Sequence, residues 1–398
     1  MEFRSVRGLE ERRSVKALLR TEFEVSPGVG AAFGRLYDDL LDRDDSTGEG
    51  RSWVAVEKGR IVGHALYGLR SLRIAGCDVA GALIGMVVVA PAFRGKGIGG
   101  SLIGCLEEAA RSEGCLVVQL AGDLGYYSRF GYVDGYVDGV QTLEPASRRP
   151  TGFRDAVASD IDRLTRWSLA HVPAGAVVPS DRRWRWLLET GHPGGLTGTN
   201  ERMVGFRSTE DRVIVSDDGY ASFAAGDGVF VVYEAGADHP DRLLDDLRAY
   251  AAEFGVPRLE LRLPSRHPVA MAWERGRSSP NPEFLVKSLD TAALFERVRT
   301  EIDSRLAGVE EPGPVVTLSI GSFSLRIGRS LEVTTSDEGH DGEGDRIYVP
   351  EIGLIRALLG RDSVADMVQR RGGGARSVSL LRAGFPPGEP FFWLADAI

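Results

Sequence analysis

The spacing of apolar positions changes several times along the chain, and each change predicts a different element. Apolar side chains recur every three or four positions in residues 10–24, 31–44 and 101–114, which is typical of amphipathic helices. Short strand-like runs lie between the second and third of these patterns. They cover residues 52–59, 60–76 and 82–90. Only a few turn residues join them, and such short connections favour antiparallel neighbours.

The same mixture of helical and strand-like patterns returns in the second third of the chain, at residues 153–290. Helical spacing then covers residues 293–308 and 350–371, with strand-like runs between them. Polar or turn-rich segments at 144–152 and 284–292 indicate boundaries. We therefore predict three domains, at residues 1–147, 148–288 and 289–398, and an α/β fold class with mixed α+β sheets.

Composition narrows the class of protein. The chain has 398 residues, of which 43% are hydrophobic, and a net charge of −9, which argues against general affinity for nucleic acid or anionic membrane. No apolar run is long enough to predict a membrane-spanning helix, and the charged N-terminus lacks the apolar core of a signal peptide. The three cysteines, Cys77, Cys105 and Cys115, have no metal-ligand spacing. They predict free thiols in a reducing cytoplasm.

A glycine-rich loop, R-G-K-G-I-G at residues 94–99, separates an apolar strand pattern from a helical pattern. Loops of this kind hold phosphates at a helix N-terminus, where unpaired N–H groups and the positive end of the helix dipole converge. Gly95, Gly97 and Gly100 fit the dinucleotide pattern G-x-G-x-x-G, and Asp123 follows at a suitable distance. That fingerprint normally follows the first strand of a parallel series, however, whereas this loop follows several hairpin-like strands.

The same loop resembles the acetyl-CoA site of the GNAT acyltransferases, whose signature is [QR]-x-x-G-x-[GA] after a strand. The order strand, Val89-Ala90-Pro91, glycine loop and helix also matches that family. The resemblance implies acetyl-CoA as cofactor, with the strand pairing with the pantetheine arm and the loop binding the pyrophosphate. The implied coenzyme-binding residues are Val87, Val88, Val89, Arg94, Gly95, Lys96, Gly97, Ile98, Gly99 and Gly100.

A second motif, Y-Y-S-R-F-G-Y at residues 126–132, resembles the Y-x-R-F-G-[YF] segment of the Eis-like aminoglycoside and lysine acetyltransferases. The chain length and the C-terminal runs L-F-E-R-V and Y-V-P-E-I-G are similar to that group as well. This resemblance implies a GNAT domain, a second GNAT-like domain without a coenzyme loop, and a C-terminal domain with the sterol-carrier fold. It also implies a hexamer.

The resemblance further implies the catalytic groups. Tyr127 occupies the position of the general acid that protonates the departing thiolate, and the adjacent Tyr126 is a rival for that role. The carboxylate of the terminal residue, Ile398, would be the base, with Asp396 as a possible substitute. The apolar run P-F-F-W-L-A before it favours a buried tail over a disordered one.

An amine acceptor needs acidic and aromatic groups at its entrance. Candidates for substrate binding are Phe23, Phe33, Tyr37 and Asp38. His64 lies in a strand pattern and is expected to be a core or rim histidine. His340, in an acidic glycine-rich loop, is expected to be surface, and no metal site is predicted. For R-R-W-R-W at residues 182–186, interdomain packing is expected.

The leading hypothesis is an acetyl-CoA-dependent N-acetyltransferase that acts on amines of a cationic small molecule, such as an aminoglycoside or polyamine, or on lysine side chains. Two alternatives from other classes remain: a lipid-binding protein, and an acyl-CoA sensor without transferase turnover. The acceptor is not determined by the sequence.

Overall fold

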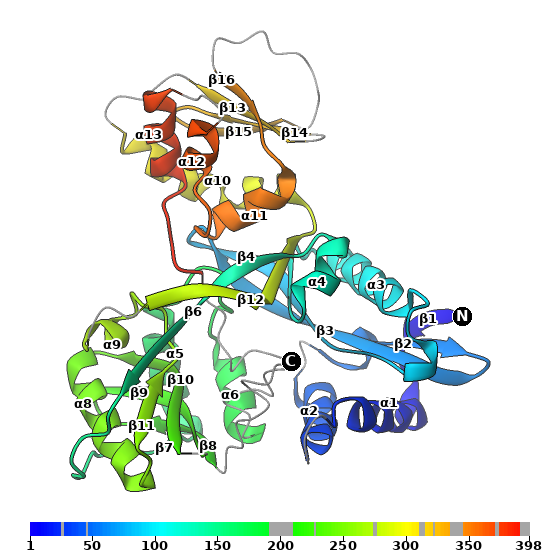
Figure 1. The fold of residues 1–398 in the computed structure, drawn as a ribbon, viewed down its shortest axis with the longest axis vertical. Helices are drawn as coiled ribbons and strands as arrows, with labels where there is room; N and C mark the ends of the chain where they lie inside the picture. Colours follow the sequence, from blue (N-terminus) through cyan, green and yellow to red (C-terminus); the bar gives the residue numbers. More distant parts are fainter. Residues whose placement is uncertain are drawn as a thin grey trace.

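The computed structural model describes residues 1–24, 28–44, 47–190, 210–226, 228–273, 277–309, 315–320, 323–334, 345–370 and 374–390. Three predicted positions, His340, Asp396 and Ile398, therefore lie outside the described residues, as does the run 391–395. Figure 1 shows two α/β units joined through a common sheet and a third unit packed on one end of them. The α/β fold class predicted from the sequence is confirmed.

The first unit begins with five neighbouring strands of the large sheet. They are β1 (Glu2–Ser5), β2 (Ser52–Glu57), β3 (Arg60–Ile74), β4 (Cys77–Val89) and β5 (Val117–Ala121). The pairs β2–β3 and β3–β4 are antiparallel, as their short turns predicted. The pair β4–β5 is parallel, because helix α3 (Ile98–Ser112) provides the long crossover between these strands.

Helices cover both faces of this part of the sheet. Helices α1 (Gly8–Glu22) and α2 (Val29–Arg43) lie on one face, and α3 lies on the other (Figure 1). Buried side chains of α1 and α2 pack with Val54, Leu66 and Met86, whereas those of α3 pack with Ala82 and Ile84. Two separate apolar layers therefore hold the sheet between the helices.

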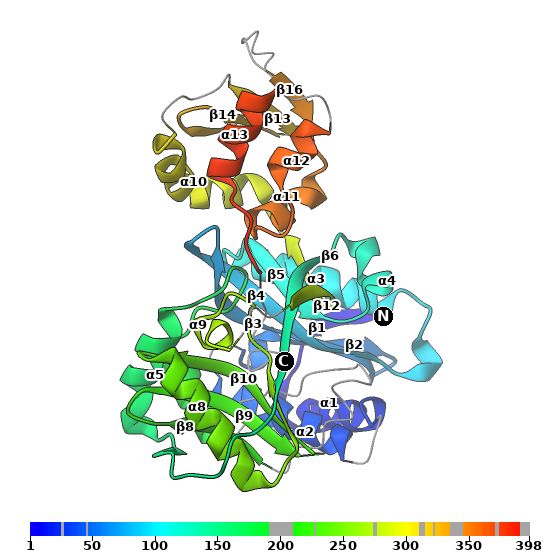
Figure 2. The same ribbon diagram turned by 60° about the vertical axis from the view of Figure 1, so that its left-hand side comes forward.

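The second unit continues the same sheet by exchanging strands with the first. Strand β12 (Arg277–Ser288) lies between β5 and β6 (Val133–Leu143), and β6 in turn pairs with β11 (Arg258–Leu261). The sheet then ends with β10 (Val229–Ala237), β9 (Gly219–Gly226), β8 (Glu210–Val215) and β7 (Arg154–Asp155). Figure 2 shows β6 and β12 at the junction of the two units. The exchange makes one twelve-stranded sheet.

Helices α4 (Leu124–Tyr127), α5 (Ile161–Leu169), α6 (Asp181–Thr190), α8 (Pro240–Ala251) and α9 (Pro268–Met271) complete these two units. Trp186 in α6 packs against both the α1–α2 layer and the apolar cluster of the second unit. The interdomain packing expected for residues 182–186 is thus confirmed.

The second unit repeats the strand–helix–parallel strand order of β4, α3 and β5 in β10, α8 and β11. The connection differs in one respect. Residues 90–97 join β4 to α3, whereas only residues 238–239 join β10 to α8, and Pro240 opens that helix. The β10–α8 connection therefore has no counterpart of the glycine loop that joins β4 to α3.

The third unit packs helices against one face of a small sheet with the order β15–β14–β13–β16. Its elements are α10 (Thr291–Ala307), β13 (Val316–Ile320), β14 (Phe323–Ile327), β15 (Leu331–Thr334), β16 (Asp345–Tyr348), α11 (Glu351–Leu358), α12 (Val364–Gln369) and α13 (Ala375–Gly384). The prediction of one helix across 350–371 is wrong, because Gly360 takes a φ of 79° and α11 ends before it.

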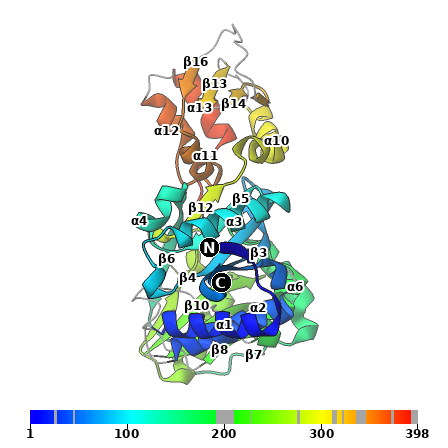
Figure 3. The ribbon, with the colours of Figure 1, turned by 90° about the vertical axis from the view of Figure 1, so that its right-hand side faces the viewer.

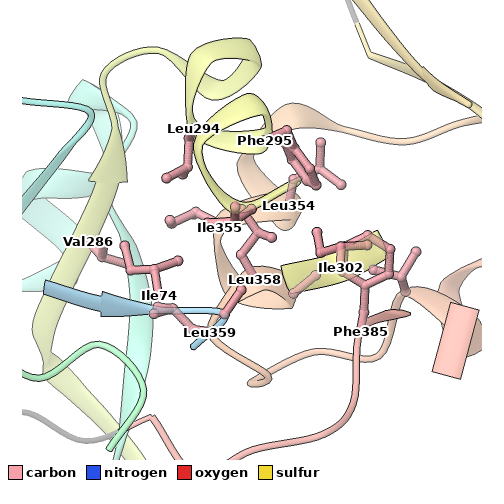
Figure 4. Packing of buried hydrophobic residues seen from close by; sticks show 14 of the residues in the cluster. Ile74, Val286, Leu294, Phe295, Ile302, Leu354, Ile355, Leu358, Leu359 and Phe385 are labelled. Atoms are coloured by element: carbon pink, nitrogen blue, oxygen red, sulfur yellow. The ribbon is translucent and has the colours of Figure 1, made fainter. Parts of the chain in front are cut away.

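The apolar core of the third unit continues into the first two. Figure 4 shows Leu294, Leu358 and Leu359 of the third unit close to Ile74 and Val286 of the large sheet. All five side chains are at most 3% exposed. The third unit is therefore held by a continuous core and not only by its connecting segments.

Candidate functional site

A cleft of about 570 Å³ opens in the first unit where β4 and β5 separate. Its lining comes from β4, the glycine loop, the start of α3, the end of α1 and the α4 region, and Figure 3 shows the side of the molecule that carries α1, α3 and α4. The lining residues are Glu22, Phe23, Val87, Val88, Val89, Phe93, Arg94, Gly95, Gly97, Ile98, Gly99, Gly100, Tyr126, Tyr127, Arg129 and Phe130. Nine of the ten predicted coenzyme residues, all but Lys96, thus lie around one cavity.

The cleft exists because β4 stops pairing with β5 after Ile84, although β4 itself continues to Val89. The carbonyl oxygen of Ala80 still accepts a hydrogen bond on the β5 side, from the N–H of Leu116, which immediately precedes β5, at 2.9 Å. Ala90, which should face the same edge in a regular strand, instead donates to the carbonyl oxygen of Val62 in β3 at 2.9 Å. One extra residue must therefore lie in β4 between these positions.

That extra residue is at Met86, where the pairing with β3 shifts and the backbone has a φ of 51°. The side chains show the same change: Ala82 and Ile84 pack on the α3 side, but Met86 and Val88 pack on the α1–α2 side. This β-bulge places the backbone N–H and C=O of Val87 on the open edge of β4. A positive φ in a residue other than glycine costs on the order of 1 kcal/mol, which the surrounding packing must offset.

The glycine loop fits a phosphate-bearing ligand. Gly95 and Gly97 have φ angles of 75° and 76°, and a side-chain carbon at either position would have nothing within 4 Å of it. Within the described part of the chain, no side chain caps the N-terminus of α3, which begins immediately after Gly97. Its first N–H groups therefore face the cleft mouth, where a pyrophosphate would satisfy them.

Gly99 and Gly100 are glycines for a different reason. A side-chain carbon at Gly99 would lie 2.6 Å from the hydroxyl of Tyr126, and one at Gly100 would lie 2.7 Å from the ring of Phe130. These two positions are required for the α4 region to pack on α3. The glycines of the loop thus serve two purposes, open space at Gly95 and Gly97 and packing at Gly99 and Gly100.

Both candidate acids lie in the cleft. The side chain of Asp123 accepts hydrogen bonds from the N–H groups of Gly125 and Tyr126 and so begins the short helix α4. The rings of Tyr126 and Tyr127 pack edge to face with centroids 5.0 Å apart. The Tyr127 ring also lies against Gly122, where a side-chain carbon would approach it to 2.3 Å.

The two tyrosines have different surroundings. Burial raises the pKa of Tyr127, and the neighbouring Tyr126 and Asp123 add to this shift. Tyr126 is held from outside by Arg129, whose guanidinium lies 4.6 Å from the ring centroid and donates a hydrogen bond to the Tyr126 carbonyl oxygen at 2.8 Å. The Tyr127 hydroxyl therefore stays protonated over a wide pH range.

The mouth of the cleft carries charges of both signs. The side chain of Arg94 donates to the carbonyl oxygen of Val89 at 3.0 Å and forms an ion pair with Glu22 at the end of α1. Lys96 lies 4.9 Å from the ring centroid of Phe93. Arg129 adds a third cation. Glu22 was not among the predicted residues, because no local motif marks it and it meets Arg94 only through the fold.

The structure separates the four predicted substrate-binding residues. Phe23 lines the cleft, and Phe33 supports it by stacking on its ring at 4.1 Å between centroids. Asp38 pairs with Lys16 on the surface between α1 and α2. Tyr37 is fully buried, with its hydroxyl 3.1 Å from that of Ser52, so this position supports the fold behind the cleft and offers no surface to a substrate.

The structure also shows the surroundings of His64 and of the cysteines. His64 is fully buried, as expected for a core histidine, and burial lowers its pKa to about 3. The three cysteines are free thiols. No group of three potential metal ligands occurs among the described residues, and none of the helices described is long and apolar enough to cross a bilayer.

Comparison with known proteins agrees with this geometry. Residues 13–132 match the model of the acetyltransferase (GNAT) family, so this part of the chain is a GNAT acetyltransferase domain, and acetyl-CoA is the acyl donor of that family. No curated protein sequence matches the chain.

Several solved structures share the fold over the whole chain. A GCN5-related N-acetyltransferase from Kribbella flavida is 19% identical with a TM-score of 0.68, covering 100% of this chain and 98% of its own. Eis1 from Mycobacterium abscessus is 17% identical with a TM-score of 0.64, covering 100% of both chains. A GCN5-related N-acetyltransferase from Anabaena variabilis is 13% identical with a TM-score of 0.69, again over 100% of both. Identities this low establish a common fold.

Proposed function

We propose that this chain, whose residues 13–132 form a GNAT acetyltransferase domain, transfers the acetyl group of acetyl-CoA to an amine of a cationic small molecule or to a lysine side chain. The observation that carries the proposal is the convergence of the glycine loop, the open edge of β4 and Tyr127 on one cleft. These residues come from different elements of one segment, residues 87–127, and each supplies a different requirement of acyl transfer.

Acetyl-CoA supplies an acetyl group activated as a thioester. The N-terminus of α3 would hold its pyrophosphate, with Arg94 and Lys96 adding positive charge nearby. The backbone of Val87 and Val89 on the open edge of β4 would bind the amide-bearing pantetheine arm as an added strand. An N–H in this segment would also hydrogen-bond the thioester carbonyl oxygen, where negative charge develops during transfer.

Tyr127 is our candidate for the general acid. A proton donor must be protonated when the thiolate departs, and burial, which raises the pKa of Tyr127, maintains that state. Tyr126 lies in the same cleft and remains the rival, because its hydroxyl lies beside Gly99 in the first turn of α3.

The acceptor side of the cleft is formed by Glu22 and Phe23 at the end of α1. A carboxylate beside an aromatic face favours a cationic amine, because both attract positive charge. This pair, supported by Phe33, replaces the group of four residues predicted from the sequence as the entrance for the acceptor.

The carboxylate of Ile398 stays our proposal for the base. Support comes from the segment before it, which returns from the third unit to the junction of the first two. There the N–H of Val137 in β6 donates to the carbonyl oxygen of Pro390 at 2.9 Å, and Glu389 accepts from the N–H of Arg266 at 3.0 Å. Strand β6 is three strand spacings from β4, about 14 Å. Eight extended residues after Pro390 can cover about 26 Å, which is enough to reach the cleft.

We retain the division into residues 1–147, 148–288 and 289–398 as a proposal, with the second domain GNAT-like and the third of the sterol-carrier type. Assembly as a hexamer and a cytoplasmic location belong to the same Eis-like hypothesis.

A panel of acceptors tests the function directly. Aminoglycosides, polyamines, lysine peptides and aryl amines would each be incubated with acetyl-CoA, and release of the free thiol would be measured. We expect amine-dependent release with at least one cationic class. Strong coenzyme binding without release would instead favour the acyl-CoA sensor.

Thermal stabilisation separates the remaining alternative. A ligand at 100 times its Kd stabilises the native state by about 2.7 kcal/mol. The transferase hypothesis predicts this effect from acetyl-CoA, whereas the lipid-binding hypothesis predicts it from a fatty acid alone.

A further inference from the structure

A buried polar chain lies directly behind the bulge of β4. The hydroxyl of Tyr37 is 3.1 Å from that of Ser52, whose oxygen is 3.0 Å from Nε2 of His64. On the other side of the imidazole, Nδ1 is 3.1 Å from the carbonyl oxygen of Met86. Tyr37, Ser52 and His64 are all fully buried. Side chains from α2, β2 and β3 thus form a series of hydrogen bonds that ends at one backbone carbonyl of β4.

The donors and acceptors available set the direction of each hydrogen bond from Tyr37 to Met86. A carbonyl oxygen can only accept, so the proton of the imidazole must be on Nδ1. The imidazole is neutral because burial lowers its pKa to about 3, and Nε2 therefore accepts from Ser52. The hydroxyl of Ser52 then donates to His64 and leaves its oxygen to accept from Tyr37. Ser52 thereby favours the imidazole tautomer that carries its proton on Nδ1 and donates it to Met86.

Met86 is the residue whose conformation opens the edge of β4. Its φ of 51° is unfavourable for a side chain, and without the bulge Val87 would face β3. The hydrogen bond from His64 gives the Met86 carbonyl oxygen a partner. The bulge has removed this oxygen from the regular pattern of hydrogen bonds between neighbouring strands. A polar group in this fully buried position needs such a partner.

We propose that His64 is a positioning residue for acetyl transfer, holding the Met86 carbonyl so that the β4 bulge keeps the backbone N–H of Val87 aimed into the cleft. The inference rests on the proposed function. His64 does not line the cleft, and its effect on the reaction passes through Met86 and Val87.

Comparing two substitutions of similar polarity shows whether His64 acts by holding the Met86 carbonyl or only by filling space in the core. The amide nitrogen of Asn occupies nearly the position of imidazole Nδ1, so His64→Asn can still donate to Met86. The amide of Gln reaches instead toward the position of Nε2, so His64→Gln keeps the contact with Ser52 and loses the donor to Met86. The measurements are kcat with the best amine of the panel, the Kd of acetyl-CoA by calorimetry, and the melting temperature.

We expect His64→Gln to lower kcat about ten- to a hundredfold relative to His64→Asn, because misplacing a reacting group by about 1 Å has effects of that size. The Kd of acetyl-CoA should change less than about tenfold in both variants, since the phosphate loop is separate from the bulge and Val87 would supply only one hydrogen bond to the pantetheine arm. Equal kcat values in the two folded variants would overturn the proposal. So would a fall in kcat that only follows the loss of coenzyme binding.

If His64→Gln does not fold, Ser52→Ala decides. It leaves His64 and Met86 in place but removes the donor that selects the Nδ1–H tautomer, so kcat should fall at unchanged coenzyme affinity. Wild-type kcat in Ser52→Ala would then overturn the proposal. Failure of the proposed function has a different signature: the wild-type protein itself would bind acetyl-CoA and release no thiol with any amine.

Discussion

The buried histidine behind β4 makes the first unit sensitive to acid, and the size of this effect can be calculated. The pKa of His64 is about 3 in the folded protein and about 6.5 in an unfolded chain. The unfolded state therefore binds more protons between these values. The contribution of His64 to the free energy of unfolding is complete above pH 6.5 and is lost as the pH falls toward 3. Between pH 7 and pH 5 the loss from this one group is about 2 kcal/mol.

The matched comparison is His64→Asn, which keeps a donor to Met86 but cannot titrate. Other groups also titrate in this range, so the informative quantity is the difference in unfolding free energy between wild type and variant at each pH. The variant should be the less stable protein at pH 7. The gap should then shrink by about 2 kcal/mol at pH 5, because only the wild type has an imidazole that stays neutral when folded and is protonated on unfolding.

Hydrogen exchange of backbone amides in β3 and β4, measured in low urea at pH 7, 6 and 5, is the suitable assay. It reports the opening of the first unit separately from that of the other units. A gap that stays constant within about 0.5 kcal/mol from pH 7 to pH 5 would refute the reasoning, since His64 would then have nearly the same pKa in both states.

The remaining predictions concern catalysis. Tyr127→Phe should lower turnover far more than coenzyme affinity in the thiol-release assay, and unchanged turnover would reassign the acid to Tyr126 or to water. Gly122→Ala should lower turnover at least about tenfold, because the new methyl group would lie 2.3 Å from the Tyr127 ring and displace it. Gly104→Ala is its control, since nothing lies within 4 Å of a side-chain carbon there, and it should leave turnover unchanged. A few residues added after Ile398 should abolish most transfer at unchanged acetyl-CoA affinity; full activity would remove this carboxylate from the mechanism.

The proposed coenzyme side of the cleft was predictable because its signal is local. The strand 86–89, the loop 94–97 and the start of α3 follow one another in the chain, and helix N-termini bind phosphate through groups within a few residues. The tyrosine motif at 126–132 was found for the same reason. The antiparallel pairing of β2 with β3 and of β3 with β4 also followed from their short turns.

The proposed acceptor side was only partly predictable, because it is assembled from distant segments. Acidic and aromatic residues near α2 suggested an entrance, but the structure turns Tyr37 into the core and Asp38 toward Lys16. Glu22 belongs to the cleft only because α1 packs beside the loop that carries Arg94. Such a contact depends on how a helix is rotated about its own axis. The sequence pattern shows which broad face of the helix is buried, but not which residue at the edge of that face meets a given neighbour.

Most of the elements, their approximate limits and a loop suited to phosphate could be predicted from the sequence, because these depend on residue spacing and on backbone groups close together in the chain. Contacts between distant segments set the exchange of β6 and β12 between the two units. They also set the register shift at Met86, where the side chains of β4 change the face of the sheet on which they pack. Neither has a local signal, since Met86 is an ordinary apolar residue in a strand pattern. Its backbone takes a positive φ only because the surrounding packing and the buried chain through His64 favour the bulge over a regular strand.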